Sequence, residues 1–70
     1  MTEHHQLGLL IRRARQRKHM TQQQLASALG VDRWTVGAWE SGKHFPSRYA
    51  GAIEEILGIT IPAEPAKAAP

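Results

Sequence analysis

The sequence predicts an all-α domain of four short helices around one aliphatic core. Seventy residues can bury a single small core, and the 41% of hydrophobic residues include only two Trp, one Tyr and one Phe. Residues 21–42 contain two short amphipathic segments joined by a glycine, and each follows a polar residue that can cap a helix. One apolar stripe precedes this pair and another follows it, so four helices are expected.

The first helix is expected over residues 6–18, where apolar residues recur at i, i+3, i+4 and i+7. Arg15 follows Ile11 by one helical turn and therefore lies at the edge of the buried stripe. The stripe consists of Leu7, Leu10, Ile11 and Ala14. The other faces carry Arg12, Arg13, Arg17 and Lys18.

The second helix is predicted to begin near Gln22. Thr21 and Gln24 have the spacing of a capping box, in which side chains satisfy the first backbone amides of a helix. The helix ends at Gly30, because glycine tolerates the left-handed conformation that follows many helices. Its buried face consists of Leu25, Ala26 and Leu29.

The third helix is predicted to follow Asp32 as its cap and to end at Gly42. At about 100° per residue, its inward side carries Val36, Trp39 and Glu40. Its outward side carries Trp34, Gly37, Ala38 and Ser41, with Arg33 and Thr35 at the flanks. A large apolar ring such as Trp34 on an outward face marks a contact surface, unless it folds back over its own domain.

The fourth helix is expected from Arg48 to Leu57, with Ser47 as its cap and Gly58 as its end. Its apolar positions are Tyr49, Ala52, Ile53, Ile56 and Leu57. Glu54 and Glu55 are interpreted as solvated residues on the side away from the basic region.

The domain is expected to cover residues 1–61, and the Pro- and Ala-rich residues 62–70 are expected to be a disordered tail or a linker. Ile59 and Ile61 leave three interpretations open. They form a weak homodimer interface with the loop before the fourth helix, they belong to a monomer that pairs only on its ligand, or they complete the core.

Basic residues are concentrated in the middle of the chain. From Arg12 to Arg48 there are eight basic and two acidic residues, a local charge of +6 against +3 for the whole chain. Such a stretch is typical of a surface that binds a polyanion, although a solvated helix surface gives the same count.

The order of residues from Leu7 to Ile59 resembles the helix-turn-helix domain of the Cro and phage-repressor type. The matching residues are Leu7, Ile11, Arg12, Arg15, Met20, Thr21, Gln22, Leu25, Ala26, Leu29, Gly30, Val31, Val36, Trp39, Glu40, Gly42, Lys43 and Pro46. The resemblance implies a lambda-repressor-like fold of four helices, or of five as in many phage repressors. It also implies a sequence-specific DNA-binding transcriptional regulator of phage, plasmid or bacterial origin.

The resemblance further implies that residues 33–41 are a recognition helix that enters the major groove. Its base-contacting residues are expected to be Arg33, which can bind guanine, Trp34, which can contact a thymine methyl, and the short Gly37 and Ala38. The expected phosphate contacts are Gln22, Thr35, Ser41 and Lys43. Arg12 and Arg17 are expected to contribute only to the positive electrostatic field. A structural ion pair is implied between Arg15 and Glu40.

The sequence argues against several other classes. It has no cysteine, and its four histidines lack metal-ligand spacing, so no metal or other cofactor is expected. No apolar run approaches the ~18 residues of a membrane span and no signal-peptide pattern is present, so a cytoplasmic protein is expected. A nucleophile with a base and an orienting group is lacking, which argues against an enzyme.

The expected partner is double-stranded DNA carrying a pseudo-palindromic operator, bound either by a weak homodimer or by a solution monomer that pairs only on the DNA. The alternative is an antitoxin or accessory protein of the same fold, in which the exposed Trp34 or the tail contacts another protein.

Overall fold

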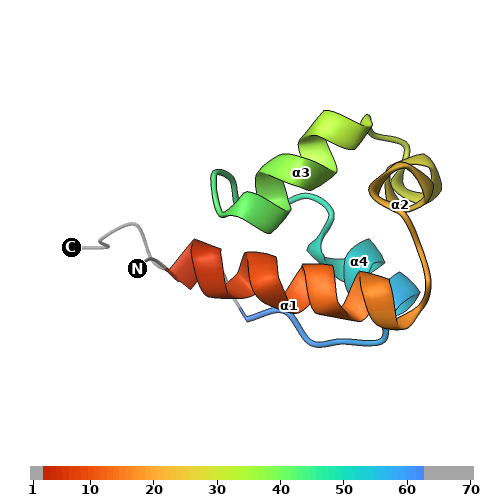
Figure 1. Cartoon of the computed structure of the whole chain (residues 1–70). Coiled ribbons are helices and arrows are strands. Elements are labelled where there is room, and N and C mark those ends of the chain that lie inside the picture. Colours follow the sequence, from red (N-terminus) through yellow and green to blue (C-terminus); the bar gives the residue numbers. More distant parts are fainter. Residues whose placement is uncertain (1–2, 63–70) are drawn as a thin grey trace.

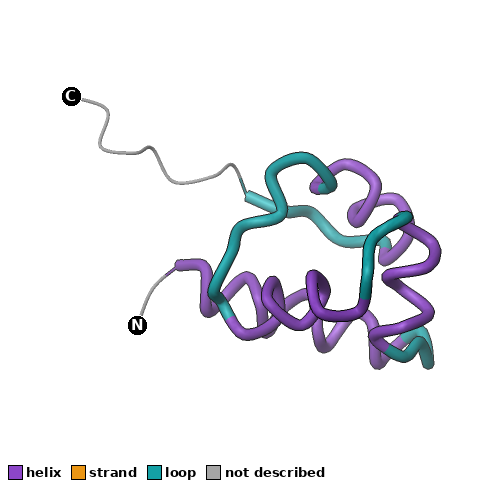
Figure 2. Tube along the Cα trace, turned by 90° about the horizontal axis from the view of Figure 1, so that it is seen from above, coloured by secondary structure: helices purple, strands orange, loops and turns teal. Residues whose placement is uncertain are grey.

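A computed structural model describes residues 3–62 of the chain, and every regular element in this range is a helix (Figure 2). The four helices are α1 (Glu3–Arg17), α2 (Gln22–Leu29), α3 (Arg33–Ser41) and α4 (Ala50–Leu57). α1 lies along one side of the molecule, and α3 lies across from it, with α2 beside the start of α3 (Figure 1). The all-α prediction is confirmed. The predicted tail, apart from Pro62, lies outside the described residues.

The ends of α2 and α3 follow the predicted caps. The Thr21 hydroxyl accepts the backbone N–H of Gln24 at 3.0 Å, and the Gln24 side chain accepts the backbone N–H of Thr21 at 2.8 Å. Asp32 accepts the backbone N–H of Thr35 at 2.9 Å in front of α3. Left-handed glycines follow both helices, with φ of 77° at residue 30 and 85° at residue 42. These local signals therefore fix the turn that joins the two helices.

The boundaries of the outer helices differ from those expected. α1 begins at Glu3, three residues before the predicted start. The prediction that Ser47 caps α4 is wrong, because residues 47–49 form a turn and the helix begins only at Ala50. Tyr49 occupies the cap position without a side-chain capping bond, and its carbonyl accepts the N–H of Ile53 at 2.8 Å. A serine before an apolar pattern thus misplaced the start of α4 by two residues.

The core is aliphatic, as expected, with one tryptophan. Its buried residues are Leu7, Ile11, Ala14, Leu25, Ala26, Val36, Trp39, Ile53, Leu57 and Ile61. Two predicted core positions are wrong: Leu10 is 38% exposed, and Ala52 is also exposed. Gly8 is buried on α1, and a Cβ built there would lie 2.3 Å from the carbonyl oxygen of Glu40. α1 is rotated so that this glycine, instead of Leu10, faces the close approach of α3.

The segment after α4 packs back onto the helices and passes α1 (Figure 1). Ile61 is 8% exposed and belongs to the core, which confirms the interpretation that it completes the core within one chain. Glu54 accepts the backbone N–H of Ile61 at 2.7 Å, so its interpretation as a plain solvated residue is wrong. Glu55 is exposed, as expected. One glutamate of α4 therefore holds the returning segment in place.

Candidate nucleic-acid interface

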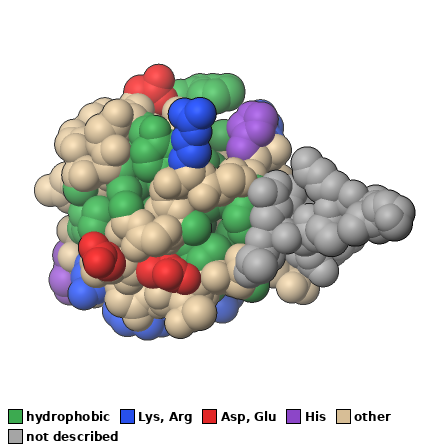
Figure 3. All heavy atoms as spheres, turned by 180° about the vertical axis from the view of Figure 1, so that it is seen from behind, with side chains coloured by type: hydrophobic (Ala, Val, Ile, Leu, Met, Phe, Trp, Pro, Cys, Tyr) green, Lys and Arg blue, Asp and Glu red, His purple; other side chains and the backbone are tan. Residues whose placement is uncertain are grey.

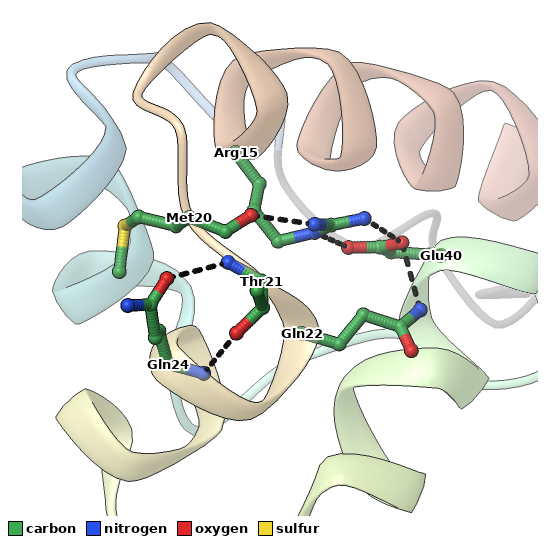
Figure 4. Close-up of polar contacts among 6 residues, drawn as sticks. All are labelled: Arg15, Met20, Thr21, Gln22, Gln24 and Glu40. Atoms are coloured by element: carbon green, nitrogen blue, oxygen red, sulfur yellow. Dashed lines mark hydrogen bonds and ion pairs between the residues drawn. The ribbon is translucent and has the colours of Figure 1, made fainter.

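Arg15 and Glu40 form an ion pair that joins the end of α1 to the end of α3 (Figure 4). Arg15 Nε donates to Glu40 Oε2 at 2.6 Å, and Arg15 Nη2 donates to Glu40 Oε1 at 3.1 Å. Arg15 Nη1 donates to the carbonyl of Met20 at 2.7 Å, in the connection before α2. Both charged residues are only 8% exposed. The two-pronged geometry gives both buried charges hydrogen-bond partners and fixes α3 relative to α1.

Gln22 extends this network to α2. Its Nε2 donates to Glu40 Oε1 at 3.0 Å, so the first residue of α2 is bound to the last turn of α3 (Figure 4). The sequence analysis predicted a phosphate contact for Gln22 but not this bond to Glu40. One carboxylate thus orients α1, α2 and α3 together.

An open groove of about 670 Å³ lies where the end of α1, the start of α2 and one side of α3 meet. It is lined by Arg12, Arg15, Met20, Thr21, Gln22, Gln23, Arg33, Gly37, Glu40 and Ser41. The groove therefore brings together four residues proposed for DNA contact from the sequence, namely Gln22, Arg33, Gly37 and Ser41. It also includes Arg12, which was expected to supply only a field.

Thr35 lies on a different side of α3. It lines a smaller hollow of about 200 Å³ together with Trp39, Phe45, Pro46, Ser47, Arg48 and Tyr49. Its hydroxyl donates to Asp32 Oδ1 at 2.7 Å, and this bond, followed by the bond from its backbone N–H, holds the pKa of the Asp32 carboxyl below its usual value of 3.8. The predicted phosphate contacts are thus divided between two sides of α3.

The hydroxyls proposed as phosphate donors are already engaged. Ser41 Oγ donates to the carbonyl of Ala38 at 3.2 Å, and the Thr35 hydroxyl donates to Asp32. A hydroxyl has one hydrogen to donate, and an ionised phosphate oxygen only accepts. Each residue would therefore have to exchange an internal bond for a phosphate contact. Lys43 is exposed, and its ammonium group has three donors for an anion.

The outward side of α3 differs from the helical-wheel prediction at one position. Ala38 is 4% exposed, so its expected place on the outward face is wrong. Its carbonyl accepts the backbone N–H of Lys43 at 3.0 Å, which folds the loop after α3 back against the helix. Trp34 is 68% exposed, as expected, and its ring centroid lies 6.4 Å from that of His44 in the same loop. Arg33 is exposed beside it.

Charge is unevenly distributed over the surface. The view from behind shows hydrophobic and uncharged atoms over the centre of that face, two acidic side chains below them, and basic side chains both along the lower edge and at the top (Figure 3). Among the described side chains, no group of three His, Asp or Glu residues could hold a metal ion. Within residues 3–62, none of the helices is long and apolar enough to span a membrane.

Two short helices joined by a left-handed glycine, with the second presenting Arg33 and Trp34 to solvent, define a helix-turn-helix DNA-binding domain. The helix-turn-helix family model matches residues 11–63, most of the chain, and the protein belongs to this family. It is a DNA-binding regulator of the Cro and phage-repressor type. A comparison with curated proteins found no match.

Proposed function

We propose that this protein is a sequence-specific transcriptional regulator that inserts α3 into the major groove of its operator. The observation that carries the proposal is the exposure of Arg33 and Trp34 on a helix whose opposite side is anchored. Trp34 is 68% exposed, whereas Glu40 on the same helix is 8% exposed and bonded to two other helices. A helix that is anchored on one side and has exposed side chains at its N-terminal turn suits base readout, because base contacts depend on orientation.

Each exposed residue has a chemical role in this proposal. Arg33 donates two hydrogen bonds to O6 and N7 of a guanine, and the Trp34 ring contacts a thymine methyl. Gly37, which has no side chain, permits close approach of the backbone. Lys43 and the second amide hydrogen of Gln22 contact phosphates. Because DNA is the ligand, the protein acts inside the cell, and the operator is pseudo-palindromic if two copies bind side by side.

The proposal is tested by selecting bound sequences from random duplex DNA at two salt concentrations, followed by titration of two variants on the selected site. Arg33→Ala should weaken binding by about 1–3 kcal/mol and relax the preference at one base pair. Lys43→Ala should weaken binding to all sequences equally and lower the slope of log K against log salt by about one unit. Unchanged base preference in Arg33→Ala would refute the assigned orientation of α3.

The exposed Trp34 also suits a second function, that of an antitoxin or accessory protein which contacts another protein through this ring. The two functions are separated by the same experiment. A chain that enriches no DNA sequence and shows no salt-dependent binding, yet forms a complex with one protein partner, would favour the second.

A further inference from the structure

The groove between α1, α2 and α3 carries two uncompensated positive charges. Three arginines and one glutamate line it, and the buried pair of Arg15 with Glu40 neutralises one of the arginines. Arg12 from α1 and Arg33 from α3 remain, both exposed. Neither has a carboxylate partner among the described side chains. Two guanidinium groups from different helices therefore face one open groove.

The groove is kept open by the absence of a side chain at Gly37. A Cβ at this position would meet only Gln22 Nε2, at 3.9 Å, so a longer side chain would extend from α3 into the groove. Gln22 Nε2 carries two hydrogens, and Glu40 accepts one of them. Gln22 therefore has one N–H left to donate to a ligand, whereas the Glu40 carboxylate already accepts hydrogen bonds from Arg15 and Gln22.

The position of the groove relative to α3 restricts the kind of ligand that the groove can bind. An α-helix with its side chains is about 10–12 Å across, and the major groove of DNA is about 12 Å wide. A helix in that groove therefore has the sugar-phosphate backbone along its sides. Residues 33, 37 and 41 lie one helical turn apart on the side of α3 that forms the groove. A backbone phosphate beside this row would lie between α3 and α1.

We propose that this groove binds a backbone phosphate of the DNA and that Arg12 contacts it directly. The inference depends on the proposed function, which places α3 in the major groove. The chemistry fits, because a guanidinium group donates parallel hydrogen bonds to two phosphate oxygens and keeps its charge at every physiological pH. Arg12 is thereby a positioning contact from outside the helix-turn-helix pair, and it sets the angle at which α1 approaches the DNA strand.

Arg12→Gln and Arg13→Gln form a matched pair for the test. Both arginines are exposed, both substitutions remove one positive charge from α1, and only Arg12 lines the groove. A direct phosphate contact contributes about 0.9 to the slope of log K against log salt. Arg12→Gln should therefore lower the slope by about 0.9, on selected and random DNA alike. Because the counterion-release contribution vanishes at 1 M salt, this change corresponds to about eightfold weaker binding at 0.1 M salt. Arg13→Gln should lower the slope much less.

Arg12→Lys supplies the conservative variant and should retain most of the slope, because a lysine of this length still reaches a phosphate. Circular dichroism on all three variants verifies the fold. If the wild-type protein binds DNA but Arg12→Gln and Arg13→Gln have equal salt slopes, the phosphate site is overturned and the proposed function stays intact. Failure of the wild-type protein to bind DNA would overturn both.

Discussion

Replacing Gly8 with alanine probes how closely α1 approaches the recognition helix. The added Cβ would lie 2.3 Å from the carbonyl oxygen of Glu40 and 2.7 Å from that of Trp39. Weak C–H···O contacts have carbon–oxygen distances of about 3.3–3.6 Å, so α1 would have to move away from α3 by about 1 Å. The opposing atoms belong to the backbone and cannot rotate aside. The same movement would lengthen the bonds between Arg15 and Glu40.

The expected loss follows from two opposing terms. Alanine favours a helix over glycine by about 1 kcal/mol, whereas an overpacked contact costs about 1–3 kcal/mol and occasionally more. A clash with two backbone carbonyls that also disturbs a buried ion pair belongs at the upper end of that range. Gly8→Ala should therefore lower the free energy of unfolding by about 2 kcal/mol. In a domain of this size, that corresponds to a decrease in Tm of about 8–16 °C.

Gly51→Ala in α4 is the matched control, because nothing lies within 4 Å of a Cβ built there. This substitution should raise the free energy of unfolding by about 0.5–1 kcal/mol through helix propensity alone. Urea denaturation followed by circular dichroism measures both variants. Opposite signs are expected. If Gly8→Ala were as stable as the wild-type protein, the close contact between α1 and α3 would be refuted.

Two further predictions concern charged groups. Glu40→Ala should lower the free energy of unfolding by about 3 kcal/mol because it leaves the buried Arg15 without its partner, whereas Glu55→Ala at an exposed site should change it by less than about 0.5 kcal/mol. Equal losses in urea denaturation would contradict this. The lowered pKa of Asp32 predicts a second effect: its stabilising contribution is complete above its usual pKa of 3.8 and is lost as the pH falls through the lowered folded value. Asp32→Asn keeps a capping oxygen but does not titrate, so its free energy of unfolding, measured between about pH 2 and 5, should depend less on pH than that of the wild-type protein. An unchanged pH dependence would show that other groups cause it.

The sequence predicted those features of the fold that depend on near neighbours. Thr21 and Asp32 accept hydrogen bonds from residues three positions ahead, and the glycines at 30 and 42 end the helices that they directly follow. The rotation of α1 was less well predicted. Spacings of three and four residues fit a stripe that contains Leu10 as well as one that contains Gly8. The choice depends on the backbone of α3, which approaches too closely for any side chain.

The sequence predicts a set of candidate site residues but not how they are arranged in space. The bonds from Gln22 to Glu40 and from Ile61 to Glu54 depend on how helices and loops pack, which helical spacing does not reveal. Ala38 illustrates the same limit, because the loop that folds back after α3 lies near it. A row of polar and small residues on one helix therefore predicted that a surface exists. Only the packing shows that this surface includes Arg12 from another helix.

Under the proposed function, the burial of Ala38 restricts base readout to the first turn of α3 and thereby bears on how many copies bind one operator. Arg33 and Trp34 are exposed there, Gly37 has no side chain, and Ala38 is 4% exposed. One bidentate arginine discriminates between bases by about 1–3 kcal/mol, whereas specific DNA binding exceeds non-specific binding by about 4–10 kcal/mol. A single domain with one such contact falls short of that range, whereas two copies on a symmetric site would reach about 2–6 kcal/mol, which overlaps the lower part of the range. This arithmetic supports the proposal of a pseudo-palindromic operator, on which two chains bind half-sites about 10 base pairs apart.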